Sequence, residues 1–546
     1  MPAKSRYWRI VQSPFVFAIV VSLVLMSFYN WRFCSETIEA THPATVEDVL
    51  FLLSLFVILV LAHVTVFLLL PNPHTLRITA ASVFTFSAAT AFFIDSYSVN
   101  IDKEMIRNLF ETDTQEASAF IVPRLGLYLI LLGVVPAVVA LRTRLVSPPL
   151  GHRLAQRFGF LAIGLAVTAG LLFQFYGHYT SFFSEHETRA LLNPARPIGG
   201  LASYLRAELS SGADVFIDDP ENHGRSLAAA LGQKPLLVFL VVGETARARN
   251  FQLGGYSRRT NPELATISNL YYFDNVVSCG TSTAVSVPCM FSPEGHESFT
   301  VADARHHSNL LDALQTAGVY VEWRENNSSS KGVAARVRTV NFMGDAKASG
   351  CGTNGCYDED MVSGLAAQLK ELKQNSVIVF HDLGSHGPAY WLRYPPRFEM
   401  FKPVCRTSEL WKCSREALVN TYDNTILYTD HVIAEQIRLL ESVSASVDSL
   451  LIYISDHGES LGEHGHYLHG TPYAFAPEEQ TKVPFLLWMS EGYRQRFSVD
   501  DRCLQTELHR PMTHDSVYHT VLGALGVRNA NYESALDVLG SCWGAN

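Results

Sequence analysis

The side chains best suited to chemistry follow three apolar runs in the later part of the chain. These runs cover residues 236–242, 376–380 and 449–454. Glu244 follows the first run, His386 follows the second, and Asp456 with His457 follows the third. Carboxylate oxygens and imidazole nitrogens form a ligand set that zinc prefers, with one position left open for a substrate. The sequence therefore predicts a metal centre if these segments meet in space.

The elements around these runs indicate how the segments would meet. A continuous apolar run is typical of a central strand that is covered on both faces. Helical stretches lie between the runs, at Asn309 to Thr316, Met361 to Lys373 and Asn420 to Val443. Strands that alternate with helices predict an α/β domain with a mostly parallel sheet, and ligands gather at the carboxyl ends of such strands. We expect this domain to cover residues 234–546.

A nucleophile is the next requirement, and residues 278–289 supply hydroxyl groups. A hydroxyl at the start of a helix there would lie beside backbone N–H groups able to hold phosphate oxygens. A metal ion would also make its alkoxide accessible near neutral pH. Spacing alone does not choose between Thr281, Ser282 and Thr283, and a serine- and threonine-rich turn without a catalytic role is the alternative.

The first 180 residues are dominated by apolar runs long enough to cross a bilayer, which takes about 20 residues. The expected spans are Pro14 to Trp31, Val49 to Leu70, Ile78 to Tyr97, Ile121 to Leu141 and Phe158 to Tyr176. Four further spans follow the first, so a cleaved signal peptide is not expected. We therefore predict a transmembrane domain of five helices over residues 1–177.

The charges of the loops predict which side of the membrane each part occupies. Basic residues cluster before the first span and in the second and fourth connections: Lys4, Arg6, Arg9, Arg77, Arg142, Arg144, Arg153 and Arg157. The opposite loops are acidic, so the basic side should be the cytoplasm. An odd number of spans then exports everything after the fifth. We expect a bacterial inner-membrane protein with a periplasmic connector over residues 178–233 and a periplasmic catalytic domain.

Cysteine usage agrees with export. Eight of the nine cysteines lie beyond residue 180. The expected disulfides are Cys279 with Cys289, Cys351 with Cys356, Cys405 with Cys413 and, held less firmly, Cys503 with Cys542. A thiolate zinc cluster would need closely spaced cysteine pairs with a histidine partner, and the sequence has none. Cys34 is left over near the end of the first span.

Net charge excludes one class of partner. The chain carries a formal charge of −10, and it has no basic stripe or arginine-rich run. Nucleic-acid binding is therefore not expected. We expect a monomer embedded in a membrane.

Several short segments of the sequence resemble the motifs of a known family. They are Gly243 to Thr245, Ser278 to Phe291, Asn326 to Gly332, His386 to Tyr390, Asn420 to Asn424 and Ser455 to Glu463. Together they are similar to the membrane phosphoethanolamine transferases of the alkaline phosphatase and sulfatase superfamily. The closest similarity is to the lipid A-modifying enzymes, including the mobile colistin-resistance type. The resemblance spans essentially the whole chain.

The resemblance implies roles for individual residues. One tightly bound zinc would be held by Glu244, Thr283, Asp456 and His457, with Thr283 as the nucleophile. His386 and His469 would contact the transferred phosphate or a second zinc, and Lys331 would bind a phosphate oxygen. His464 and His466 match nothing in the family pattern; they would face solvent or modulate metal occupancy.

The third loop between the spans, which is exported and has helices near residues 98–120, is a second candidate site. If Lys103 to Phe120 is one helix, then Asn108, Thr112 and Glu116 share a face because they are spaced four residues apart. The same three residues resemble those that the family uses to bind a lipid head group. Without the resemblance, a solvated polar face is the simpler interpretation.

The resemblance implies transfer of phosphoethanolamine from phosphatidylethanolamine to a phosphate of lipid A through a covalent phosphothreonine, which would confer resistance to polymyxin and colistin. A sister enzyme acting on lipopolysaccharide core sugars or another periplasmic glycan is the alternative. A sulfatase would need a Cys/Ser-x-Pro-x-Arg word, which is absent around Thr283. A membrane sensor without enzymatic activity would bind no metal.

Overall fold

The computed structural model describes residues 11–111, 114–146, 148–185, 191–210, 216–226, 234–342 and 356–543. The chain divides into two compact units. Unit 1 comprises Met1–Ile106 and Ile121–Ser203, and unit 2 comprises Arg107–Phe120 and Tyr204–Asn546. Unit 1 is built from apolar helices, and unit 2 contains a seven-stranded sheet with helices on both faces.

Four helical segments of unit 1 are long and apolar enough to cross a membrane. They are α3 (Val46–Leu69), α4 (Pro73–Tyr97), the run from Pro123 to Arg142, and α9 (Leu150–Gln174). The Pro123–Arg142 run consists of α7 (Pro123–Tyr128), a π-helical stretch at Leu129–Val134 and α8 (Val135–Arg142). Pro136 lacks an N–H group, so it cannot close a regular α-helical turn at this point.

The first helix of the structure is shorter than the predicted span from Pro14 to Trp31. Helix α1 (Pro14–Phe28) is followed by α2 (Trp31–Thr41), bent by 61°, and the pair makes a fifth span only if both are counted together. Asn30 lies at the bend, where its side-chain amide donates to Leu25 O (3.0 Å) and Asn193 O (2.6 Å). These bonds tie the bend to the end of α1 and to the distant segment at Asn193.

In the exported third loop, the structure describes the helical segments α5 (Lys103–Glu111) and α6 (Thr114–Ala119). The prediction required one helix from Lys103 to Phe120. The two residues between α5 and α6 lie outside the described range, so a face shared by Asn108, Thr112 and Glu116 is not established.

The sheet of unit 2 has the strand order β5-β13-β10-β4-β9-β7-β8. Its strands are β4 (Leu236–Gly243), β5 (Leu270–Phe273), β7 (Tyr320–Glu325), β8 (Arg338–Asn341), β9 (Ser376–His381), β10 (Asp448–Ser455) and β13 (Phe485–Met489). The pairs from β10 through β4, β9 and β7 to β8 are parallel, whereas β13 is antiparallel to both of its neighbours. The predicted mostly parallel sheet is confirmed, with its three apolar runs adjacent at the centre.

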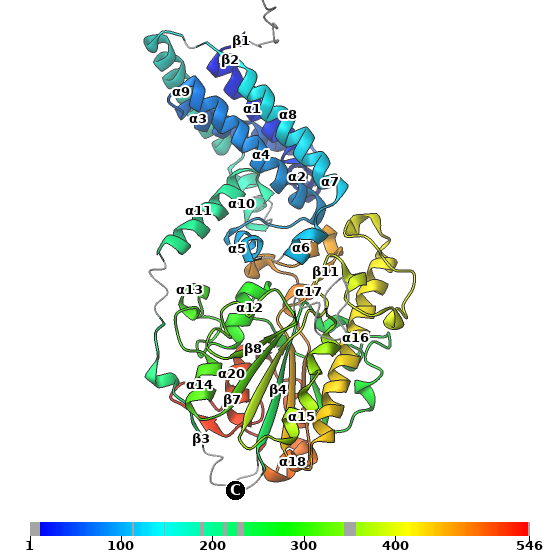
Figure 1. Cartoon of the computed structure of the whole chain (residues 1–546). Helices are drawn as coiled ribbons and strands as arrows, with labels where there is room; N and C mark the ends of the chain where they lie inside the picture. The colour runs from blue at the N-terminus through cyan, green and yellow to red at the C-terminus, as the bar shows by residue number, and fades with distance from the viewer. Residues whose placement is uncertain are drawn as a thin grey trace, which may run out of the picture. The chain divides into compact units, whose positions relative to one another are not determined.

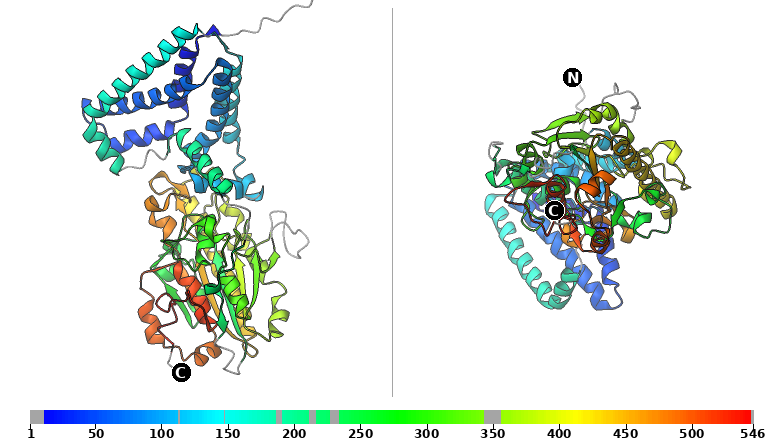
Figure 2. Two further views of the ribbon diagram at one scale, coloured as in Figure 1. Left: turned by 90° about the vertical axis from the view of Figure 1, so that its left-hand side faces the viewer. Right: turned by 90° about the horizontal axis from the view of Figure 1, so that it is seen from below.

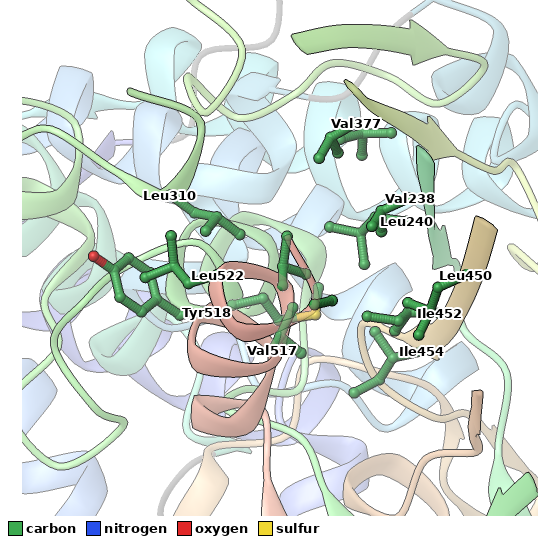
Figure 3. Packing of buried hydrophobic residues seen from close by; sticks show 14 of the residues in the cluster. Val238, Leu240, Leu310, Val377, Leu450, Ile452, Ile454, Val517, Tyr518 and Leu522 are labelled. Carbon is green, nitrogen blue, oxygen red and sulfur yellow. The ribbon is translucent and has the colours of Figure 1, made fainter. Parts of the chain in front are cut away.

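Both faces of the central strands are buried, as a continuous apolar run requires. Val238 and Leu240 of β4 pack on the same side as α14 (Leu310–Thr316) and α20 (Asp515–Ala524) (Figure 3). Helix α20, red in Figures 1 and 2, covers this face, and α16 (Arg415–Ser442) covers the other. The β4 strand is therefore buried on both faces, and Glu244 directly follows its last residue at the carboxyl-end edge of the sheet.

Two predicted helices differ in extent. Helix α16 begins at Arg415, five residues before the predicted start, because Ser414 caps it by accepting from Ala417 N (3.2 Å). The stretch from Met361 to Lys373 is helical only in part, as a 3₁₀ turn at Asp358–Val362 and α15 (Leu365–Lys370). Gly364 interrupts it with φ of 77°, a conformation that favours glycine.

Three of the expected disulfides are confirmed: Cys279–Cys289, Cys405–Cys413 and Cys503–Cys542. The fourth expected pair includes Cys351, which lies outside the described residues. Cys34 is a free, half-buried cysteine.

Candidate metal centre and nucleophile

The carboxyl ends of β4 and β10 bring three ligand-type side chains together. Glu244, Asp456 and His457 each offer an atom within 4.8 Å of the others, and all three are fully buried. The two strands pair in parallel register from Leu236 opposite Asp448 to Gly243 opposite Ser455. Because the register is unbroken, the residues that follow both strands emerge side by side.

Of the three candidate hydroxyls at residues 281–283, that of Thr283 contacts this cluster. Its Oγ1 lies 3.1 Å from Glu244 Oε2 and 3.4 Å from His457 Nε2. Thr283 is the first residue of α12 (Thr283–Met290), and Ser282 before it has an extended N-cap conformation. The sequence left three candidates open, and this geometry singles out Thr283.

The orientation of His457 suits a metal ligand. Its Nδ1 lies 2.9 Å from Gly458 O, and a carbonyl can only accept, so Nδ1 carries the proton. The lone pair of Nε2 then faces Asp456 Oδ2 (3.2 Å) and Glu244 Oε1 (3.6 Å). Zinc-binding histidines are usually fixed in this way, through a hydrogen bond from the other ring nitrogen.

The charge of the cluster also fits a cation. Burial and the nearby Glu244 carboxylate raise the pKa of Asp456 well above its usual range. Burial lowers the pKa of His457 to about 3, so this imidazole is neutral near pH 7. Asp456 Oδ2 is fully buried without a hydrogen-bond partner in the described part of the chain. A divalent cation would pair this oxygen and remove the repulsion between the two carboxylates.

Backbone strain occurs at the same place. Thr245 has φ of 57°, which is rare for a β-branched residue. Its N–H donates to Asp456 Oδ1 (2.9 Å), and its side-chain hydroxyl donates to Glu244. The strained turn therefore fixes both carboxylates, and strain of this kind is typical of functional sites.

Two further histidines border the cluster. The ring of His469 lies 4.4 Å from that of His457, and the ring of His386 lies 5.5 Å from that of His469. Glu459 is fully buried, and its Oε2 binds His469 Nδ1 at 2.8 Å. A carboxylate accepts, so this Nδ1 carries a proton and the Nε2 of His469 is left for other contacts.

The sequence-based prediction missed Asn327 and Glu459. Asn327 follows β7, and its amide donates to Glu244 Oε2 (2.8 Å) and to Asp382 O (3.0 Å). A signal was present, because the residues after a parallel strand end at the same rim. The strand itself was overlooked since its charged and apolar residues alternate.

The remaining predicted residues lie in different places. Lys331 has φ of 52°, donates from Nζ to Ser328 Oγ (2.8 Å), and borders a cavity of about 230 Å³. His464 is exposed and His466 is half-buried in the turn between β11 (Ser460–Leu461) and β12 (Tyr467–Leu468).

The residues of the third loop are described only in part. Asn108 lies on α5 and is half-buried, and Glu116 lies within α6. The prediction for Thr112 falls outside the described residues.

Comparison with known proteins assigns both parts of the chain. The family model described as phosphoethanolamine transferase EptA/EptB matches residues 58–209, and the sulfatase model matches residues 237–527. Phosphoethanolamine transferase EptA of Escherichia coli K12 is 38% identical over 95% of this chain and 96% of its own length. Phosphatidylethanolamine transferase Mcr-1 of Escherichia coli is 36% identical, over 96% of each chain.

A solved structure agrees over nearly the whole length. The integral membrane protein lipooligosaccharide phosphoethanolamine transferase A (EptA) from Neisseria meningitidis matches with a TM-score of 0.92 and 33% identity, covering 98% of this chain and 100% of its own. The N-terminal helices thus form a membrane domain, and the α/β domain is periplasmic. The chain belongs to the EptA-type phosphoethanolamine transferases.

Proposed function

We propose that this chain transfers phosphoethanolamine from phosphatidylethanolamine to a phosphate of lipid A, through a covalent intermediate on Thr283 at a zinc site. The observation that carries the proposal is the position of Thr283 Oγ1, between Glu244 (3.1 Å) and His457 (3.4 Å).

The ligands of the zinc would be Glu244, Thr283, Asp456 and His457. When bound there, the metal supplies a Lewis acid for a phosphate oxygen and lowers the pKa of the threonine hydroxyl. A second zinc near His386 and His469 stays a prediction.

In the first step, Thr283 Oγ1 attacks the phosphorus of the donor and the bond to the diacylglycerol oxygen breaks. His386 or His469 accepts the hydroxyl proton and returns it to the departing diacylglycerol. The start of α12 contributes backbone N–H groups that can hold the phosphate oxygens. Phosphoethanolamine is then joined to Thr283.

In the second step, a hydroxyl oxygen of the acceptor phosphate attacks the same phosphorus and the bond to Thr283 Oγ1 breaks. His386 or His469 accepts the proton of the acceptor hydroxyl and passes it to Thr283 Oγ1. Lys331 supports this chemistry as a point charge for a phosphate oxygen. Asn108, Thr112 and Glu116 would bind the lipid head group, with Glu116 facing the ammonium. The product carries a zwitterion where lipid A carried an anion, so cationic polymyxin and colistin would bind less well.

The proposed division of labour follows the predicted domains. Residues 1–177 anchor the chain in the membrane, residues 178–233 connect the two domains, and residues 234–546 catalyse the transfer. Part of the exported loop, Arg107–Phe120, clusters with unit 2, in line with a role in binding substrate.

Mass spectrometry of lipid A tests the proposal. Cells that lack their own phosphoethanolamine transferases should gain one phosphoethanolamine on lipid A when they express the wild type, and none with Thr283→Ala. Ser286→Ala is the matched control, because Ser286 is fully buried on the same helix and its hydroxyl has no hydrogen-bond partner among the described residues. It should leave the modification unchanged.

The donor and the intermediate can be checked in the purified protein. Incubation with phosphatidylethanolamine alone should add phosphoethanolamine to the peptide that contains Thr283. Unmodified lipid A beside a modified core oligosaccharide would instead assign the chain to the sister reaction. Modified lipid A in cells expressing Thr283→Ala would refute the role of Thr283.

A further inference from the structure

His514 is a buried histidine outside the metal cluster. It has no exposed surface and immediately precedes α20. Its side chain does not cap that helix, although it occupies the N-cap position. The backbone N–H of His514 donates to Val277 O (3.2 Å), next to the pairing of β14 (Met512–Thr513) with β6 (Val276–Val277). The imidazole is therefore anchored beside the segment that leads to the nucleophile.

Both ring nitrogens of His514 bind backbone groups, and their roles are fixed. Cys279 N–H donates to Nδ1 (3.1 Å), so Nδ1 has no proton. Nε2 then carries the proton and donates to Ser455 O (3.0 Å). Burial lowers the pKa of His514 to about 3, which keeps the ring in this neutral form.

These two contacts reach two segments that carry the reaction centre. Cys279 begins the loop that ends at Thr283, and its disulfide to Cys289 closes that loop around the first turns of α12. Ser455 is the last residue of β10 and directly precedes Asp456 and His457. One imidazole thus connects the backbone of the nucleophile loop to the backbone of the metal-binding strand.

Other contacts hold the nucleophile loop from a different direction. Thr281 Oγ1 donates to Thr471 O (2.6 Å), and Gly470 N donates to Thr281 O (2.8 Å). These bonds attach the loop to the segment after His469. Among the described side chains, His514 is the one whose hydrogen bonds join the loop to β10.

We propose that His514 is a positioning residue that sets the distance between the Thr283 nucleophile and the Asp456–His457 side of the metal centre. The bond from Cys279 N–H to Nδ1 carries this role, because it restrains the loop itself. This inference rests on the proposed function, in which Thr283 attacks phosphorus. A displacement of the order of 1 Å at a reacting group can lower a rate strongly without weakening substrate binding.

Two substitutions in the full-length protein each remove one of the two hydrogen bonds of His514 and keep the other. In His514→Asn, the side-chain oxygen replaces Nδ1 and keeps the acceptor for Cys279 N–H. In His514→Gln, the side-chain nitrogen replaces Nε2 and keeps the donor for Ser455 O. Each variant loses one buried hydrogen bond, so both should lose similar stability.

Catalysis should distinguish them. We expect His514→Gln to lower kcat for transfer about tenfold with KM unchanged, and His514→Asn to stay within about threefold of the wild type. The rate at which phosphatidylethanolamine alone labels Thr283 should fall in parallel with kcat. Zinc content should be equal in both variants, because Glu244, Asp456 and His457 remain.

His519→Gln is the matched control. His519 is also buried on the same segment, and its Nδ1 accepts from Glu533 N (3.0 Å). It should lose stability as His514→Gln does, while its kcat per folded molecule stays unchanged. Equal kcat for His514→Gln and His514→Asn, or a kcat that simply follows the folded fraction in all three variants, would overturn the proposal. If the wild type itself transferred no phosphoethanolamine, that result would instead contradict the proposed function.

Discussion

Two buried polar clusters lie on the same rim of the sheet, and they differ in charge balance. The metal cluster joins Glu244 and Asp456 to the neutral His457, and Asp456 Oδ2 has no hydrogen-bond partner in the described chain. The arginine cluster is centred on Arg247, which binds Glu463 Oε1 (3.0 Å) and Asn250 Oδ1 (2.6 Å). Burial alone would lower the pKa of Arg247, but the Glu463 carboxylate outweighs it and raises this pKa.

This difference in charge balance indicates that the metal cluster is a binding site and that the arginine cluster has a structural role. In the arginine cluster each buried charge has a partner of opposite sign, so nothing further is needed. The metal cluster carries negative charge without a cationic side chain, which suits an incoming cation. The two clusters meet at Glu459, whose backbone O accepts from Arg247 Nη1 (2.9 Å) and whose carboxylate holds His469.

The largest expected effect is a loss of activity when the metal cluster is altered. Asp456→Asn should lower transfer at least about a thousandfold, or roughly 4 kcal/mol of transition-state stabilisation. The variant should still fold, because the substitution removes a repulsive buried charge. Thermal unfolding with and without zinc provides the check: zinc should raise the Tm of the wild type but not that of Asp456→Asn. A zinc-dependent Tm in the variant would show that the metal binds elsewhere.

Substitutions in the arginine cluster should lower the stability of the fold rather than the activity. Arg247→Met should lower the free energy of unfolding by about 3–5 kcal/mol, because it leaves the Glu463 carboxylate buried and unpaired. Combining it with Glu463→Gln should recover much of that loss. Denaturant unfolding of the two single variants and the double variant measures the coupling. Additive losses would mean that the pair does not balance charge as described.

The smallest expected effect is at the junction of the clusters. Glu459→Gln keeps the shape of the side chain but weakens its hold on His469 Nδ1. We expect kcat to fall about tenfold, with a free energy of unfolding within roughly 1 kcal/mol of the wild type. Steady-state kinetics and denaturant unfolding test this directly. A large loss of stability with normal kcat per folded molecule would make Glu459 part of the scaffold only.

Much of the α/β fold was predictable because its signals are local. The central strands are uninterrupted apolar runs, and the loops after them hold Glu244, Asp456 and His457. The bend after Phe28 was not predictable from hydropathy, and the side chain of Asn30 at this bend binds Asn193, which is 163 residues away in the sequence.

Local sequence was enough to predict the residue types that could bind a metal, the runs that form the central strands, and the three cysteine pairs that the described residues confirm. The choice of the nucleophile candidate required the three-dimensional arrangement, since Thr281, Ser282 and Thr283 are chemically similar and adjacent. It also decided that Asn327, Glu459 and His514 surround the site. Their roles depend on hydrogen bonds between segments far apart in the chain, and the direction of such bonds is set by packing rather than by local sequence.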